Sequence, residues 1–166
     1  MQLPSVDIFI GLLFLVGIGY GFILRRDKTI TTLCSVYIGM VIAGSFSETV
    51  YSFFNGNTTI ANQVWIRSNA SVSTISIVLF LICIFFISGA INSSSNRAGD
   101  VSLLEVIVYS GLTVALIISS ILNFLPPETR MHYMETSRAA TFLFKDKTWI
   151  TVAAPLILVV LNIRRK

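Results

Sequence analysis

Charge is scarce in this chain, and it is almost absent from the long apolar runs. Of the 166 residues, 54% are hydrophobic and only 12% are charged, whereas ordinary soluble domains carry about 25%. The charged residues inside the runs are acids near the run ends, Asp7, Glu48 and Glu105. A charge at the centre of a membrane helix costs ~2.5–3.5 kcal/mol. This segregation argues against a soluble domain and indicates an integral membrane protein.

Cysteine and histidine are nearly absent. Cys34 and Cys83 both fall inside apolar runs, and His132 is the only histidine. Two cysteines in separate runs are typical of small packing residues, and their spacing fits neither a disulfide framework nor a metal site. A catalytic dyad or metal site needs more partners than a lone histidine offers. The sequence therefore predicts no enzyme activity, no cofactor and no metal.

Basic residues are missing from the start of the chain. The first seven residues contain no lysine or arginine, and no small-x-small cleavage site follows the first run, so we expect no cleavable signal peptide. The formal net charge of +4 comes from bases that flank the apolar runs. The positive-inside bias of membrane proteins explains that placement, and nucleic acid is not an expected partner.

The apolar runs predict an all-α, polytopic membrane protein with four to five transmembrane helices in a bundle, forming one membrane domain. The expected spans are residues 6–24, 29–53, 72–91 and 103–125. A very short basic turn should make the first two an antiparallel hairpin. Residues 126–148 are expected to be a polar or interfacial segment, with a helix opened by Pro127. Residues 149–163, which contain Pro155, form either a fifth span, the reading we adopt, or a re-entrant or surface segment.

The distribution of bases predicts the orientation of the chain. The densest basic cluster follows the first span and is expected on the cytoplasmic side of the membrane, which places the N-terminus outside. With five spans the C-terminus lies inside. The chain is expected to cross the membrane several times. The bases predicted on the inside are Arg25, Arg26, Lys28, Arg97, Arg164, Arg165 and Lys166.

Small residues recur at four-residue spacing in three of the spans. Such spacing puts them on one helix face and lets two helix backbones approach closely. The predicted packing positions are Gly17 and Gly21 in the first span, Ser35, Gly39 and Ala43 in the second, and Gly111, Ala115 and Ser119 in the fourth. The spacing leaves open whether these faces pack within one chain, against a second copy or against a partner membrane protein.

The acids inside the runs suggest an alternative function. Ionisable groups in a membrane often line a substrate or ion path, so Asp7, Glu48 and Glu105 are candidates for the polar path of a small channel or transporter subunit. Simpler roles exist for two of them. Asp7 complements the dipole of the first helix, and Glu105 completes a capping box that Ser102 opens. Glu48 alone has no local structural role.

The order of these features resembles the colicin V production (CvpA) family of bacterial inner-membrane proteins. An acid opens the first span at Asp7, Gly17 and Gly21 lie near its end, and a basic turn follows. The second span ends in an aromatic stretch, residues 51–54. After the fourth span, Ser137 and Arg138, with the later Trp149, Ile150 and Pro155, look like the serine-containing tail segment of the family. The chain differs from the family pattern at position 20, where tyrosine replaces arginine, and at residues 104–106, where glycines are absent.

This resemblance implies a location in the bacterial inner (plasma) membrane and a non-enzymatic role in toxin (colicin) production or secretion, or in envelope homeostasis. The family brings no established catalytic residues to carry over. The leading hypothesis is therefore a membrane protein that acts by helix packing with itself or with a partner, and the runner-up is the channel or transporter subunit.

Overall fold

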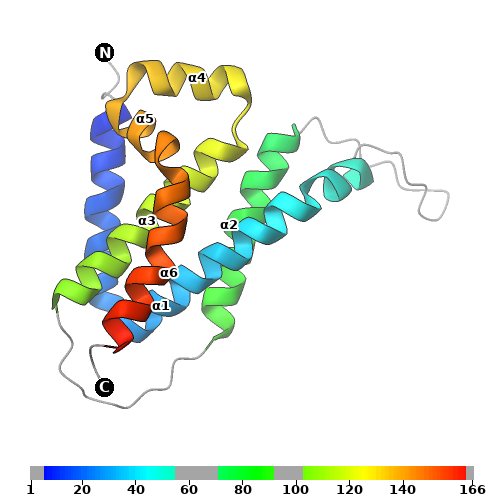
Figure 1. Cartoon of the computed structure of the whole chain (residues 1–166). Helices are drawn as coiled ribbons and strands as arrows, with labels where there is room; N and C mark the ends of the chain where they lie inside the picture. Colours follow the sequence, from blue (N-terminus) through cyan, green and yellow to red (C-terminus); the bar gives the residue numbers. More distant parts are fainter. Residues whose placement is uncertain (1–5, 55–70, 92–102, 164–166) are drawn as a thin grey trace.

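The computed structural model describes residues 6–54, 71–91 and 103–163, and its elements are α-helices (Figure 1). They are α1 (Val6–Phe54), α2 (Val72–Ala90), α3 (Leu103–Phe124), α4 (Pro127–Thr136), α5 (Arg138–Lys145) and α6 (Lys147–Ile163). Four stretches are long and apolar enough to cross a membrane: Val6–Ile23, Asp27–Phe53, Val72–Ala90 and Leu104–Phe124. The predicted all-α fold is confirmed, and the chain is a multi-span helical membrane protein.

The first two spans belong to one helix, which differs from the predicted turn between them. Residues 24–28 remain helical within α1, because Arg25, Arg26, Asp27 and Lys28 include neither glycine nor proline and tolerate a helix well. The axis nevertheless turns sharply there, so that α1 has a first arm (Val6–Ile23) and a second arm (Asp27–Phe53) (Figure 1). Two threonine hydroxyls just after the turn donate to carbonyls one helical turn earlier, a bond that often bends helices.

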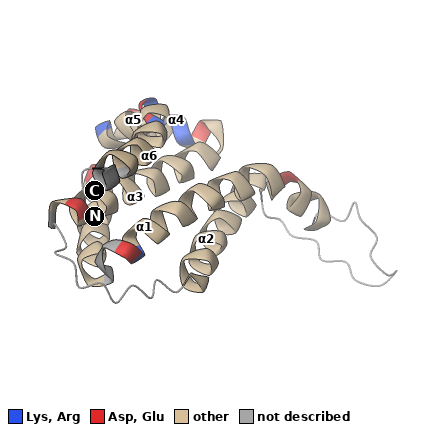
Figure 2. Ribbon diagram, turned by 60° about the horizontal axis from the view of Figure 1, so that its bottom comes forward, with Lys and Arg blue, Asp and Glu red and all other residues tan. Residues whose placement is uncertain are grey.

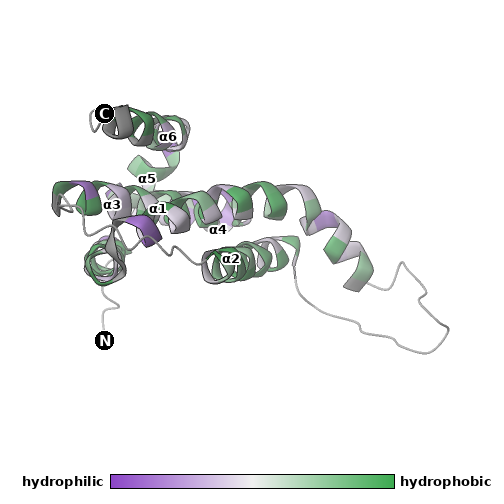
Figure 3. Ribbon diagram, turned by 90° about the horizontal axis from the view of Figure 1, so that it is seen from below, coloured by the Kyte–Doolittle hydropathy of each residue, from purple (hydrophilic) through white to green (hydrophobic). Residues whose placement is uncertain are grey.

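The helices form layers around two that run side by side. α3 and the second arm of α1 lie next to each other in the middle of the molecule (Figures 1 and 3). Seen from below, α6 lies on one side of this pair, while the first arm of α1 and α2 lie on the other (Figure 3). Half of the candidate span in α3 is buried, against 11% for α2 and for the first arm. α3 is therefore the central helix of the bundle.

The buried side chains form two apolar clusters on the two sides of α3. The first joins α3 to the second arm, α2 and α6 through Leu33, Val36, Ala43, Phe80, Tyr109, Leu116 and Ala154. The second joins α3 to the start of α1 and to α5 through Ile10, Ala115, Ile118, Leu122, Ala140 and Leu143. The ring of Phe80 meets that of Phe124 edge-on, with centroids 5.7 Å apart. Most of the remaining large apolar side chains face outward, as lipid contact requires.

The segment after α3 contains two short helices rather than one. α4 begins at Pro127, the predicted start of a helix, and Ser137 separates it from α5. α4 lies across the end of the bundle at which α1 begins, and α6 then runs to the opposite end (Figure 1). α6 has 17 residues and is not among the four candidate spans. A fifth crossing of the membrane therefore stays a prediction.

Charged residues gather at the two ends of the bundle. Figure 2 shows them on α4, on α5 and at the bend of α1, while most of the spanning stretches carry none. The bend of α1 and the C-terminal ends of α2 and α6 lie at one end in Figure 1, the arrangement that the predicted orientation requires. Several predicted features lie outside the described residues: Ser102, Arg97, Arg164, Arg165 and Lys166.

Candidate functional site

A polar junction joins the start of α1 to the start of α5. Asp7 lies in the first turn of α1. The Ser137 hydroxyl donates a hydrogen bond of 2.6 Å to Asp7 Oδ1, and the backbone N–H of Ala139 donates one of 3.1 Å to the same oxygen. The partners Ser137 and Asp7 are 130 positions apart in the chain. Asp7 therefore fixes the α4–α5 segment onto the first span.

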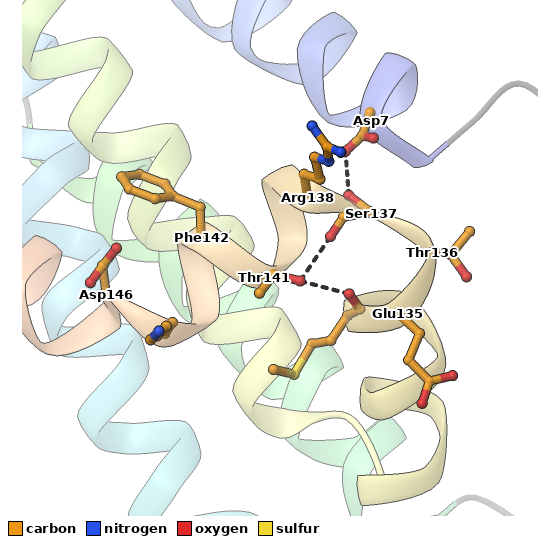
Figure 4. A pocket seen from close by; sticks show the side chains of 10 residues that line it. Asp7, Glu135, Thr136, Ser137, Arg138, Thr141, Phe142 and Asp146 are labelled. Carbon is orange, nitrogen blue, oxygen red and sulfur yellow. Dashed lines mark hydrogen bonds between the residues drawn. The ribbon is translucent and has the colours of Figure 1, made fainter.

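The local sequence explains the geometry of this junction. Ser137 is the N-cap of α5, and its Oγ accepts a 3.0 Å hydrogen bond from Ala140 N. The Thr141 hydroxyl donates to the carbonyls of Ser137 and Met134, at 3.0 and 2.6 Å. It thereby links the end of α4 to the first turn of α5 (Figure 4). Because Ser137 is only 1% exposed, its hydroxyl needs both partners, and Asp7 accepts where the helix dipole favours a negative charge.

An open pocket of about 620 Å³ adjoins the junction. Its wall comes from the first turn of α1, the end of α4, and α5. Figure 4 shows the Arg138 side chain near Asp7, Thr141 in the middle of the lining and Asp146 beyond Phe142. The lining residues are Asp7, Met134, Glu135, Thr136, Ser137, Arg138, Thr141, Phe142, Lys145 and Asp146. The pocket thus presents acids, bases, hydroxyls and apolar groups together.

The structure does not bring the three predicted polar-path acids together. Asp7 lines the pocket, and neither Glu48 nor Glu105 does. Glu105 is in the first turn of α3, next to Val106, which lies near Gly21 at the bend end of α1. Glu48 is exposed near the C-terminal end of α1, and that end of the helix lies away from α4 and α5 (Figure 2). Their separation has a simple cause, because the three acids begin or end helices whose ends lie at different corners of the bundle.

The Gly17 and Gly21 face packs within the chain, against α3. A Cβ added at Gly21 would lie 2.6 Å from Ser110 Cβ, and one added at Gly17 would overlap the Val114 side chain. Only glycine allows the two helices to come this close. The Ser110 hydroxyl is satisfied by the carbonyl of Val106, 2.6 Å away, on its own helix, so the contact leaves no donor unpaired.

The small face on the second arm packs mainly against α2. A Cβ on Gly39 would lie 3.3 Å from the Phe80 carbonyl oxygen. Ser35 and Ala43 are both fully buried, and the Ser35 hydroxyl donates to the Thr31 carbonyl at 2.8 Å. The second arm therefore uses this face for α2 and the core.

The third face of small residues, on α3, is open at Gly111 and buried at Ala115 and Ser119. Gly111 has open space where a Cβ would stand, so it brings no helix close within the described residues. Its neighbour Ser110 takes that position because adjacent residues point about 100° apart around a helix. Ala115 and Ser119 are buried, and the Ser119 hydroxyl donates to the Leu143 carbonyl of α5 at 3.1 Å. Packing of Gly111 against another chain therefore stays a prediction.

Two polar contacts between helices were not predicted. Lys28 donates to the carbonyls of Ser88 and Ile91 at 2.6 and 3.2 Å, and so caps the C-terminal end of α2. The Tyr37 hydroxyl donates to the Thr151 carbonyl of α6 at 2.6 Å. In the sequence, only Pro155 pointed to the Tyr37 contact, because a proline leaves the carbonyl four residues earlier without its helical donor.

The other candidates for chemistry stand apart from the junction. His132 is exposed on α4, and Cys34 and Cys83 are free thiols on α1 and α2. In the described ranges, no three His, Cys, Asp or Glu side chains are placed to hold a metal ion. Comparisons with protein families, curated proteins and solved structures return no match for this chain.

Proposed function

We propose that this chain is a non-enzymatic protein of the bacterial inner membrane, similar in kind to the CvpA family. It acts in toxin (colicin) production or secretion, or in envelope homeostasis. It does so by packing its helices against a second copy or against a partner membrane protein.

The observation that carries this proposal is the junction of Asp7 and Ser137. Both are polar positions on which the resemblance rests, one in the first span and one in the tail segment, and Ser137 donates directly to Asp7. Direct contact between two side chains 130 positions apart in the chain requires that the segment after the fourth span pack against the first span. The contact supports the resemblance to the family because it gives both residues the same structural role, holding the tail segment on the first span.

The remaining glycines indicate where a partner helix would lie. Gly17 and Gly21 are occupied by α3, whereas Gly11, Gly19 and Gly44 have nothing within 4 Å of an added Cβ. All three lie on α1, where most side chains of the first arm face outward. Glycines on an open membrane-facing surface allow another helix to approach closely.

A deletion strain tests the biological role. The bacterial host lacking the chain is compared with wild type for colicin release and for envelope permeability to detergents. We expect a defect in at least one of these, restored by the wild-type chain and poorly by Ser137→Ala. Thr136→Ala is the matched control, because the exposed neighbour donates only within α4, to the His132 carbonyl. No defect in either readout would contradict the proposal.

Association is tested on the purified protein in nanodiscs by light scattering and by crosslinking between protomers. The wild type should be oligomeric or should retain a partner membrane protein, and Gly19→Leu or Gly44→Leu should reduce that assembly. Gly89→Leu, also in open space but on α2, is the control. A monomer without a partner, unchanged by any of these substitutions, would contradict association through α1.

A further inference from the structure

The pocket beside Asp7 holds charges that the packing of the helices does not use. Its lining contains three carboxylates, from Asp7, Glu135 and Asp146, and two bases, Arg138 and Lys145. Asp7 is bound to Ser137 and Ala139. In the part of the chain that the structure describes, no ion pair joins Glu135 or Asp146 to the bases of the pocket. Charges of both signs thus remain available to a ligand.

The pocket lies where the bilayer meets water. Asp7 is the second residue of the first candidate span, so the pocket is at the end of that span. Phe142 in the lining is 63% exposed, and Trp149 at the start of α6 is 75% exposed. Exposed aromatic side chains at the ends of membrane helices are typical of the headgroup level. A ligand at this depth would be part of the bilayer itself.

We propose that this pocket binds the headgroup of a zwitterionic phospholipid with a primary ammonium, of the phosphatidylethanolamine type. The phosphate lies toward Arg138 and Lys145, which are seven residues apart on one face of α5. The ammonium lies toward one of two carboxylates, Glu135 or Asp146, which stand on opposite sides of the lining (Figure 4). The acyl chains leave past Phe142 into the bilayer. The pocket volume of about 620 Å³ is within the range of ligand sites, about 300–1,000 Å³.

The balance of charge selects this headgroup among common phospholipids. With Asp7 bound to Ser137 and Ala139, two carboxylates and two bases remain in the lining, so a zwitterionic headgroup matches both signs of charge, whereas an anionic headgroup such as phosphatidylglycerol leaves both carboxylates without a partner. A primary ammonium donates three hydrogen bonds to carboxylates, and the quaternary ammonium of phosphatidylcholine donates none. The pocket should therefore distinguish the two zwitterionic headgroups as well.

The test measures which lipid the full-length protein retains. The protein is reconstituted in vesicles of equal parts phosphatidylethanolamine, phosphatidylglycerol and phosphatidylcholine with identical acyl chains. It is then extracted gently, and the bound lipids are quantified by mass spectrometry. We expect phosphatidylethanolamine to be enriched about fivefold over each of the others, equivalent to ~1 kcal/mol. Equal retention of the three lipids, or a preference for either of the other two, would overturn the proposal.

Variants locate the preference in the pocket. The double variant Glu135→Gln with Asp146→Asn should lower phosphatidylethanolamine retention to that of phosphatidylcholine. Glu128→Gln, on the exposed part of α4 outside the lining, is the matched control and should keep the enrichment. Helicity and monodispersity are checked first, and the wild-type comparison decides alone if the double variant does not fold. Full enrichment in a folded double variant would also overturn the proposal.

Discussion

Removal of the Tyr37 hydroxyl should destabilise the packing of α6 on α1 only while Pro155 is present. Pro155 has no N–H, so the Thr151 carbonyl four residues earlier loses its helical donor. The Tyr37 hydroxyl donates to that same carbonyl at 2.6 Å. The proline and the tyrosine therefore act as a pair, although they are on different helices.

The expected magnitude follows from what each substitution leaves unpaired. An unsatisfied buried carbonyl costs ~1–3 kcal/mol, whereas hydrogen bonds between membrane helices average ~0.6 kcal/mol. We therefore expect Tyr37→Phe to lower the free energy of unfolding by ~1 kcal/mol, between these two estimates. In a Pro155→Ala background the new N–H satisfies the carbonyl, and the cost of Tyr37→Phe should fall below the ~0.6 kcal/mol average of a hydrogen bond between membrane helices.

The assay is a double-mutant cycle on unfolding by SDS in mixed micelles, followed by circular dichroism. Tyr20→Phe, on the exposed side of the same helix, is the control and should change the free energy of unfolding little in either background. If Tyr37→Phe costs the same with and without Pro155, the hydroxyl does not serve the carbonyl that the proline frees, and the reasoning is refuted.

Three further predictions follow from contacts of the bundle. Gly21→Ala should lower the free energy of unfolding by ~1–3 kcal/mol because the added methyl overpacks the contact with α3. Gly19→Ala should raise the free energy of unfolding slightly, since helix propensity favours alanine by ~1 kcal/mol. The SDS unfolding assay measures both. Ser137→Ala should lower stability by ~1–2 kcal/mol through loss of the cap and speed hydrogen exchange in α5, with Thr136→Ala as control. Lys28→Met should speed hydrogen exchange at the C-terminal end of α2, because its carbonyls lose their donor.

Each of these has an outcome that would contradict it. Equal costs at Gly21 and Gly19 would mean that the close approach of α1 and α3 is not what requires glycine. Unchanged exchange in α5 after Ser137→Ala would separate the cap from the stability of that helix. Unchanged exchange in α2 after Lys28→Met would mean that the two hydrogen bonds donated by Lys28 do not stabilise the C-terminal end of α2.

The apolar composition of two runs was enough to predict two of the helices. The apolar run at residues 72–91 corresponds to α2 (Val72–Ala90), and the run at residues 103–125 corresponds to α3 (Leu103–Phe124). A helix that crosses the hydrocarbon core needs about 20 consecutive apolar residues, so the ends of such a helix can be predicted from the local sequence. The continuity of α1 was missed because a cluster of charges was read as a break, although those residues are compatible with a helix.

The candidate site depended on contacts that local patterns do not contain. The spacing of Gly17 and Gly21 predicted a close-packed face, but it did not identify α3 as the helix that packs there. Asp7 was assigned to the dipole of its own helix, and its bond to Ser137 required knowing how the chain folds back over 130 positions. A single sequence holds no signal that links two such positions.

Topology mapping tests the central claim, a bundle whose two termini lie on opposite sides of the membrane, most directly. Single cysteines are introduced at positions 58, 96, 136 and 166 in a background without Cys34 and Cys83, and a membrane-impermeant thiol reagent is added to intact cells. The account predicts that positions 58 and 136 react from outside and that positions 96 and 166 react only after the membrane is opened. Labelling of position 166 from outside would contradict it, because α6 would then not cross the membrane.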